Sequence, residues 1–280
     1  MELTAVHPAL GVEVTGVNLA RPLGPDEVDE LQRAFAQRHL VLVRGQRHIE
    51  AADQVRFAGL FGPVICDQPG VDHAYVSNAR PEGIIRDGAL LFHSDLAFTS
   101  SPVLAISLAA VDVDPDGGTV TRFANAQRAL SQLSLPLRSR IEGAQALHLF
   151  DLTNQVGDRR LTEEELDPAE PRHQHPIVFP NPHNGHDVLY VNDMQTCQIT
   201  GLDRSDSDAL LGELFEVLYQ PDNIYEHHWQ PGDVIVWDNI ALQHARPNHG
   251  PTPRTLRRVS LAHHTVPELV PTFEQTPRGY

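Results

Sequence analysis

The sequence predicts a mainly β protein with surrounding helices and a sandwich or jelly-roll core. Two observations support this class. Short apolar runs of strand length recur along the chain, and helical spacing is clear in the N-terminal half, where helices can pack outside the strands. The chain has 280 residues. We expect one domain over residues 1–280, because β sandwiches and barrels often reach this length as a single unit.

The first 65 residues are predicted to form strand, helix, strand, helix. The alternation in "GVEVTGV" is typical of a strand, and Val28, Leu31 and Phe35 in the next segment follow helical spacing. Pro25 and Asp26 suit the first turn of that helix. A short buried strand, "LVLVRG", and a second amphipathic helix, "EAADQVRFAGLFGPV", follow.

The middle of the chain predicts strands and then a covering region. Residues 70–90 have loop composition, and the strands "PVLAISLAAVDV" and "TVTRFAN" flank the turn "DPDGG", which suggests an antiparallel meander. We expect a helical insertion or lid at about 125–186, with helices on both sides of a break at Pro136. Its part from 151 to 186 has weak periodicity and is expected to be a loop that covers a pocket.

The last third predicts a strand "HDVLYVND", a capped helix "SDSDALLGELFEVLYQ", and the strands "GDVIVWDN" and "RTLRRVSLAHHTV". Trp237 is expected to be core packing, and Asp238 with Asn239 to form a turn. His227 and His228 follow the helix and are expected at the surface.

Composition favours small-molecule partners. The formal net charge of −16 disfavours binding to nucleic acid and to acidic membranes, and no apolar run reaches membrane-spanning length. Cys66 and Cys197 lack paired spacing, so both are expected to be buried and reduced. The N-terminal residues show no secretory pattern, which predicts a cytoplasmic location. A homo-oligomer, dimer or tetramer, is compatible with the sequence.

The stretch "LLFHSDLAF" carries the first candidate site. In an extended segment, residues two apart share a face, so His93 and Asp95 can converge on one metal ion. His48 and Glu50 have a similar spacing, but they open an amphipathic helix, where a carboxylate is favoured by the helix dipole. His93 and Asp95 instead lie in an apolar run, where burial requires a compensating partner such as a cation.

A third ligand is expected from a distant strand. His244 follows the strand "GDVIVWDN", and two histidines with one carboxylate form the facial triad that leaves open positions on iron. Arg254 and Arg258 differ by four, so they share a face of the next strand, with Arg257 on the other. Two such guanidiniums would bind anions, and a dicarboxylate cosubstrate fits because Arg pairs with carboxylates bidentately.

With these motifs the chain resembles the TauD/TfdA family of Fe(II)/2-oxoglutarate-dependent dioxygenases. The match runs from "LGVEVTGVNLARPLGPDEVDELQRAFAQRHLVLVRGQ" through "FHSDLAF" and "GGTVTRFAN" to "WDNIALQHAR" and "RTLRRVSL". The resemblance implies a double-stranded β-helix (jelly-roll, cupin-like) core. It further implies that His93, Asp95 and His244 bind iron, that Thr121 and Arg254 hold 2-oxoglutarate, and that Arg258 contacts the cosubstrate or an anionic substrate.

The resemblance also implies a reaction. Iron(II), 2-oxoglutarate and O2 would oxidise a small organic, acidic substrate, with hydroxylation as the expected outcome and release of succinate and CO2. Asp95 disfavours halogenation, because related halogenases carry a small residue there. Leu96, Phe98 and Gln195, together with Arg258, are candidate substrate contacts. One alternative is a natural-product tailoring oxygenase that hydroxylates or desaturates, and the other is a non-catalytic jelly-roll metal- or ligand-binding protein.

Overall fold

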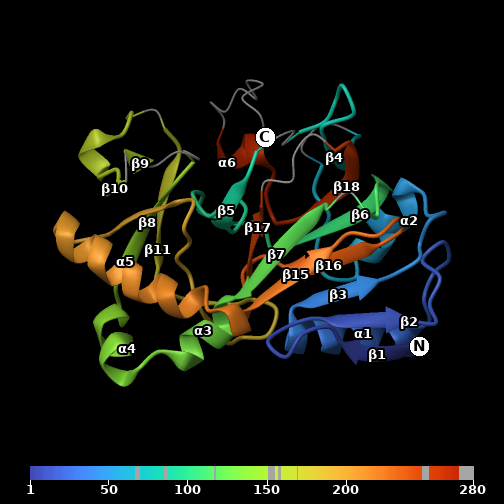
Figure 1. Ribbon diagram of the computed structural model, residues 1–280, viewed down its shortest axis with the longest axis horizontal. Helices are drawn as coiled ribbons and strands as arrows, with labels where there is room; N and C mark the ends of the chain where they lie inside the picture. The colour runs from blue at the N-terminus through green and yellow to red at the C-terminus, as the bar shows by residue number, and fades with distance from the viewer. Residues whose placement is uncertain are drawn as a thin grey trace.

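The computed structural model describes residues 1–66, 70–84, 88–116, 118–150, 155–156, 159–168, 170–247 and 252–270. Two sheets form the core, a seven-stranded sheet and a four-stranded sheet, with helices around them (Figure 1). The predicted jelly-roll class is confirmed. Among the described residues, no helix has both the length and the apolar character needed to cross a membrane.

The larger sheet carries the N-terminal module and three late strands. Every pair in it is antiparallel except the parallel pair β2–β3. Helices α1 (Pro25–Arg38) and α2 (Ala51–Ala58) pack on this sheet, α1 against β3 and α2 against β18 and β6, as Figure 1 shows. Its strands, in order, are β1 (Glu2–Ala5), β2 (Val12–Thr15), β3 (Leu40–Val43), β16 (Val234–Asp238), β6 (Ala105–Val113), β18 (Arg254–Leu261) and β4 (Ala74–Ser77).

Strand β3 shows why the central strands are apolar on both faces. Val41 and Val43 pack into the cluster under α1 and α2, whereas Leu40 and Leu42 belong to the cluster between the two sheets. Alternate side chains of one strand point to opposite faces, so a strand covered on both sides becomes a continuous apolar run. All four residues of β3 are buried as a result.

The smaller sheet is antiparallel throughout and carries His93, Thr121 and His244 of the candidate site. Its strands, in order, are β15 (Ile224–His228), β7 (Val120–Asn125), β17 (Leu242–Arg246) and β5 (Leu90–His93). Phe123 and Leu242 of this sheet share one apolar cluster with Ile106 and Ile235 of the larger sheet. The cluster therefore joins the facing sides of the two sheets.

The predicted antiparallel meander is wrong. Strands β5, β6 and β7 follow one another along the chain, yet no two of them pair. Strand β6 lies between β16 and β18, and β7 lies between β15 and β17. Local turn signals mark where strands end but do not select partners, and here the chain crosses from one sheet to the other at each turn so that both inner faces are covered.

The region 125–186 is helical only in its first part. Helices α3 (Ala126–Gln132) and α4 (Leu135–Ile141) are separated at Leu133 and Ser134, with Pro136 in the first turn of α4. Part of the predicted loop is instead a strand, because β11 (Arg172–Pro176) pairs antiparallel with β8 (Gln145–Leu149). The elements that follow are β8 (Gln145–Leu149), β9 (Gln155–Val156), β10 (Arg159–Arg160), η1 (Glu163–Glu165), β11 (Arg172–Pro176) and β12 (Val178–Pro180). A lid function for this region stays a prediction.

The remaining elements complete this end of the molecule. Strand β14 pairs with β8, and β13 with β12, while α5 packs against α3 and β14. Cys197 in β14 is buried as predicted, but Cys66 is exposed, so the prediction for Cys66 is wrong. It lies in the loop beyond Val64, outside any strand of the two sheets. These elements are β13 (Asp187–Leu189), β14 (Thr196–Ile199), α5 (Arg204–Leu218), η2 (Pro221–Asn223) and α6 (Val266–Leu269).

Asp238 orders the turn that leads into β17. Its Oδ1 accepts from the backbone N–H groups of Ile240 and Ala241, and its Oδ2 accepts from the Asn181 amide at 2.7 Å. His183 Nδ1 lies 3.2 Å from the same Oδ2. Burial acts against a charged His183, but the contact with Asp238 outweighs it and raises the pKa of His183. The predicted turn role of Asp238 agrees with these contacts.

Replacing His183 with Gln is expected to lower stability mainly at acidic pH. Because the folded-state pKa of His183 is raised, the ion pair contributes fully below the unfolded-state pKa of about 6.5, and its contribution is lost as pH rises through the folded pKa. His39 lies 3.8 Å from the same carboxylate, but burial lowers its pKa and keeps it neutral. Urea denaturation should give a loss of about 1–2 kcal/mol at pH 6 that shrinks toward pH 9. The exposed His186→Gln variant is the control, and a pH-independent loss in His183→Gln would contradict the assignment.

Candidate metal and cosubstrate site

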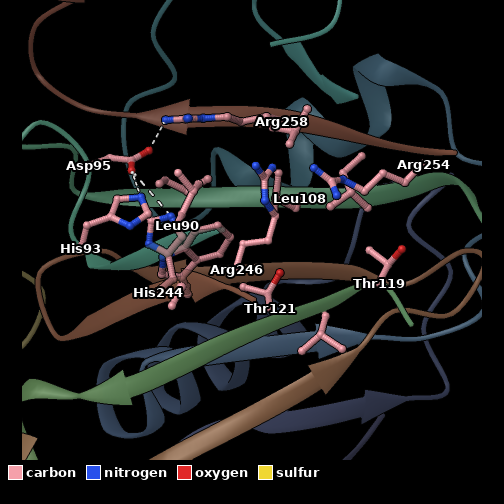
Figure 2. A pocket seen from close by; sticks show the side chains of 16 residues that line it. Leu90, His93, Asp95, Leu108, Thr119, Thr121, His244, Arg246, Arg254 and Arg258 are labelled. Atoms are coloured by element: carbon pink, nitrogen blue, oxygen red, sulfur yellow. Dashed lines mark hydrogen bonds and ion pairs between the residues drawn. The ribbon is translucent and has the colours of Figure 1, made fainter. Parts of the chain in front are cut away.

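Three candidate metal ligands meet at one end of the smaller sheet (Figure 2). His93 ends β5, Asp95 follows two residues later, and His244 lies on β17 directly opposite His93 in the strand register. Oδ1 of Asp95 lies 3.2 Å from Nε2 of His93 and 3.6 Å from Nε2 of His244. One ligand atom from each residue lies within 4.8 Å of the others, so a single ion can contact all three.

Asn239 fixes the backbone of Asp95. The Asp95 N–H donates to Asn239 Oδ1 at 3.0 Å, and Asn239 Nδ2 donates back to the Asp95 carbonyl and to the Val103 carbonyl. The next residue, Leu96, has a φ of 58°, a left-handed conformation that costs a leucine free energy. The clamp by Asn239, which is fully buried, holds the turn in this conformation and so sets the direction of the carboxylate.

The protonation states fit metal binding. His93 Nδ1 lies 2.8 Å from the Leu91 carbonyl, so Nδ1 carries the hydrogen and donates it, and Nε2 keeps its lone pair for a metal. Burial, with a further contribution from His93, lowers the pKa of His244 to about 3, so this imidazole is neutral. Burial alone would raise the pKa of Asp95, but the adjacent Arg258 guanidinium opposes it, and the pKa of that carboxyl lies well below its usual range.

Two imidazole nitrogens and one carboxylate oxygen therefore converge. This donor set suits iron(II), because it supplies the nitrogen and oxygen ligands of a facial triad. The residues present fit the ion on their own geometry and chemistry.

A cavity extends from the three ligands between the two sheets. Arg254 and Thr121 lie on opposite walls of this cavity, on β18 and β7, and Arg254 is only 1% exposed. Trp237 lines it as well as packing in the core, where the sequence predicted packing alone. The described lining residues are Val76, Leu90, His93, Asp95, Ile106, Leu108, Thr119, Val120, Thr121, Trp237, His244, Ala245, Arg246, Arg254, Leu256 and Arg258.

Arg258 contacts a candidate metal ligand directly. Its Nη2 lies 2.5 Å from Asp95 Oδ2, and its Nε donates to Ser260 Oγ at 3.1 Å. The opposite carboxylate oxygen, Oδ1, remains directed at the two histidines (Figure 2). Arg258 therefore positions Asp95 so that one oxygen is available to a metal.

Leu96, Phe98 and Gln195, the other candidate substrate contacts, are not among the described residues that line the cavity. Leu96 packs against the cluster between the sheets, and Phe98 is buried with its ring 5.1 Å from that of Phe150. Gln195 is 2% exposed, and its Oε1 accepts from Asn192 Nδ2. Their proposed contact with substrate stays a prediction.

The position of His227 differs from the sequence prediction. It was predicted at the surface, but it is fully buried on β15, where its Nε2 lies 3.1 Å from Asp233 and its ring stacks edge-on against Trp229. The chain leaves α5 through η2 and immediately enters the smaller sheet, so the helix-end reasoning does not apply. His228 is exposed as predicted.

Trp229 positions the Thr121 hydroxyl. The indole Nε1 donates to Thr121 Oγ1 at 2.9 Å, and Trp229 is 1% exposed. Thr121 Oγ1 accepts the indole hydrogen, so the hydroxyl hydrogen of Thr121 must be donated to a different acceptor. Thr121 also lines the cavity. The Thr121 hydroxyl hydrogen is thereby available for donation into the cavity.

If the cavity holds 2-oxoglutarate at Thr121, as the sequence resemblance implies, replacing Trp229 with Phe should raise the KM for 2-oxoglutarate about 3- to 10-fold, the value of one hydrogen bond of about 1 kcal/mol. Turnover at saturating 2-oxoglutarate should change little. Steady-state kinetics measures the KM for 2-oxoglutarate and the turnover number separately. In a Thr121→Val background the Trp229→Phe effect should vanish, because the hydroxyl that it orients is gone. Additive effects of the two substitutions would contradict this role.

A jelly roll with a two-histidine, one-carboxylate cluster beside an arginine-lined cavity defines the class of metal-dependent oxygenases with a double-stranded β-helix. The family model described as "Taurine catabolism dioxygenase TauD, TfdA family" matches residues 2–260. The chain belongs to this family.

Relatives cover nearly the whole chain. The alpha-ketoglutarate-dependent sulfate ester dioxygenase of Pseudomonas putida is 31% identical, over 92% of this chain and 89% of its own. Pentalenolactone F synthase of Streptomyces avermitilis is 28% identical, over 92% of both chains. Among solved structures, AAD-2 in complex with Mn(II) and N-oxalylglycine is 25% identical, with a TM-score of 0.78, over 93% of this chain and 96% of its own.

The protein is therefore an Fe(II)- and 2-oxoglutarate-dependent dioxygenase, an oxidoreductase that uses O2 and acts on a small organic molecule. The non-catalytic binding alternative is set aside, since the family is enzymatic.

Proposed function

We propose that His93, Asp95 and His244 bind the iron and that 2-oxoglutarate lies in the adjacent cavity, with its distal carboxylate at Arg254 and Thr121. One observation supports this most strongly. The three ligand atoms converge at one part of a single cavity whose lining also includes a buried guanidinium and a threonine hydroxyl. A dicarboxylate with a chelating 2-oxo acid end needs both features in one cavity.

When bound, the iron supplies the activation of O2 that is coupled to decarboxylation of 2-oxoglutarate into succinate and CO2. The chain's own residues supply geometry. Asn239 and Arg258 fix the carboxylate of Asp95, and the Leu91 carbonyl fixes the tautomer of His93. Apolar side chains such as Leu108, Ile106 and Leu256 line the cavity and limit water around the bound 2-oxo acid.

We propose that the substrate is a small organic acid and that it is hydroxylated. Arg258 supports this, because a guanidinium beside the ligand carboxylate can also approach an anion bound next to the metal. Relatives named for acidic substrates include the sulfate ester dioxygenase and the 2,4-dichlorophenoxyacetate dioxygenase of Cupriavidus pinatubonensis, which is 29% identical. The net charge of −16 supports a partner set without nucleic acid. A cytoplasmic location and a dimer or tetramer stay predictions.

A tailoring role in natural-product biosynthesis is a second candidate. It is supported by the two pentalenolactone F synthases among the relatives, 28% and 26% identical to this chain. In that case the substrate would be larger and less polar, and hydroxylation or desaturation would both be possible outcomes. Turnover of apolar polycyclic compounds in preference to organic acids would favour this candidate.

Anaerobic titration tests the site. Addition of Fe(II) and then 2-oxoglutarate to the protein should produce the weak visible charge-transfer band of the chelate, and His93→Ala should lose it. An unchanged band in His93→Ala would overturn the ligand assignment. Candidate acids would then be screened for substrate-stimulated release of succinate, and stimulation by acids but not by their neutral esters would support the substrate class.

A further inference from the structure

Arg246 lies in the same cavity as Arg254, in a position that the motif of the metal ligands does not require. It is the second residue after His244 on β17, so both side chains point to the same face of the strand. The register places His244 opposite Phe123 and Ala245 opposite Arg122 on β7. If the same register continues by one residue, Arg246 lies opposite Thr121 on β7. Both residues line the cavity.

The side chain of Arg246 is held in place. It is 8% exposed, and its Nε donates to the Gly88 carbonyl at 2.9 Å, which fixes the plane of the guanidinium. A register shift between His244 and Arg246 where β17 meets β5 changes the local direction of the strand. In Figure 2 the side chains of Arg246 and Arg254 both extend toward Leu108 on β6.

Among the residues that the structure describes, the lining of this cavity has more positive than negative side chains. The described lining residues include the guanidiniums of Arg246, Arg254 and Arg258 and one carboxylate, that of Asp95. Arg258 contacts that carboxylate at 2.5 Å. Arg246 and Arg254 bring two guanidiniums to a cavity that Thr119 and Thr121 also line, and guanidiniums and hydroxyls are donors that a carboxylate accepts from.

We propose that Arg246 is a second guanidinium for the distal carboxylate of 2-oxoglutarate, acting together with Arg254 and Thr121. This inference rests on the cosubstrate position proposed above. An ionised carboxylate offers about four lone-pair sites, so two guanidiniums and a hydroxyl can bind it at once. The consequence is selectivity: the cavity should discriminate strongly in favour of dicarboxylic 2-oxo acids over monocarboxylic ones.

The test compares two ligands on two proteins. 2-Oxovalerate has the same five-carbon chain as 2-oxoglutarate but no distal carboxylate. Both tryptophans of the chain lie at this site, since Trp237 lines the cavity and Trp229 donates to Thr121. Quenching of their fluorescence in the Mn(II)-loaded protein therefore reports binding of each 2-oxo acid without turnover.

Replacing Arg246 with Met should weaken 2-oxoglutarate binding about 10- to 100-fold, as expected for loss of charged hydrogen bonds. Binding of 2-oxovalerate should change by no more than about 2-fold, since this ligand has no group for Arg246 to hold. Arg246→Lys keeps the charge without the planar fork and should fall between wild type and Met. Combined with Arg254→Met, the losses should be non-additive, because both residues hold one carboxylate.

Arg122→Met is the matched control. Arg122 is the neighbour of Thr121 on β7, but its side chain is exposed and pairs with Glu226 at 2.6 Å. Its removal should leave both affinities unchanged. A thermal melt of each variant shows whether the fold is intact, and Arg246→Lys keeps the comparison available if Arg246→Met does not fold.

The outcomes separate the two proposals. If Arg246→Met weakens both ligands equally, or weakens neither, the role of Arg246 is overturned while the cosubstrate site stands. A change confined to the KM for the primary substrate would likewise overturn the role of Arg246 alone. If the wild-type protein itself binds 2-oxovalerate as tightly as 2-oxoglutarate, the proposed position of the distal carboxylate is overturned.

Discussion

The Asp95→Asn variant is expected to lose turnover by about 100-fold or more and metal affinity by at least about 10-fold, since loss of groups that merely support a ligand already costs that much. The physical reason lies in Arg258. Its Nη2 contacts Asp95 Oδ2 at 2.5 Å and can only donate, so it selects the amide oxygen of the new asparagine. The amide N–H2 must then face the two histidines, where it presents hydrogens in place of a lone pair.

Metal content after equilibration with Fe(II) under anaerobic conditions and the rate of succinate release would measure these losses. His48→Ala is the matched control, because His48 and Glu50 have the same spacing on an exposed helix start and should not matter. A variant that keeps one iron per chain and normal succinate release would show that Asp95 is not a metal ligand.

Replacing Arg254 with Met should reduce the affinity for 2-oxoglutarate about 100-fold, the value of a bidentate pair with a carboxylate in a buried site. Arg254 is 1% exposed and lines the cavity, and methionine keeps part of its apolar stem while it removes the guanidinium. Because the lost contact holds the cosubstrate in both ground and transition states, turnover should largely recover at saturating 2-oxoglutarate.

Calorimetric titration with 2-oxoglutarate and 2-oxovalerate would measure this loss directly. Arg254→Lys keeps a point charge but loses the fork and should be intermediate. If both ligands weaken equally in Arg254→Met, the side chain supports the fold and does not hold the distal carboxylate.

Much of this site could be predicted because its signals are local. His93 and Asp95 stand two apart, which in an extended segment places both on one face, and the structure brings their side chains within 3.2 Å. Strand β17 places His244 opposite His93, which supports the predicted role of His93 and Asp95 as metal ligands. The apolar runs also predicted most core strands, since burial on two faces leaves a continuous hydrophobic pattern.

Strand pairing and side-chain partners could not be predicted from the same signals. The neighbours β6 and β7 belong to different sheets because pairing with late strands covers both faces, and no local turn encodes that choice. Arg258 and Asp95 are 163 positions apart in the sequence, and only the packing of the sheets brings them together. Asn239 was predicted as turn chemistry alone, and its clamp on Asp95 depends on that same packing.

Arg246 was missed although a signal was present. It follows His244 by two, the same spacing that made His93 and Asp95 stand out, and it lies on a strand where that spacing shares a face. Trp229 offered no such signal, because an indole in an apolar context indicates packing, and its hydrogen bond to Thr121 depends on the pairing of β15 with β7.

The division of the site between two sheets sets when the enzyme can become active during its synthesis. The proposed metal ligands belong to the smaller sheet and the loop after β5, whereas Arg254 and Arg258 lie on β18, the last strand of the larger sheet. A nascent chain without β18 has its histidines and Arg246 but lacks Arg254 and Arg258. With 2-oxoglutarate in the proposed position, its full binding site forms only when the final strand has docked, and bound 2-oxoglutarate then stabilises the complete fold over any partly assembled one.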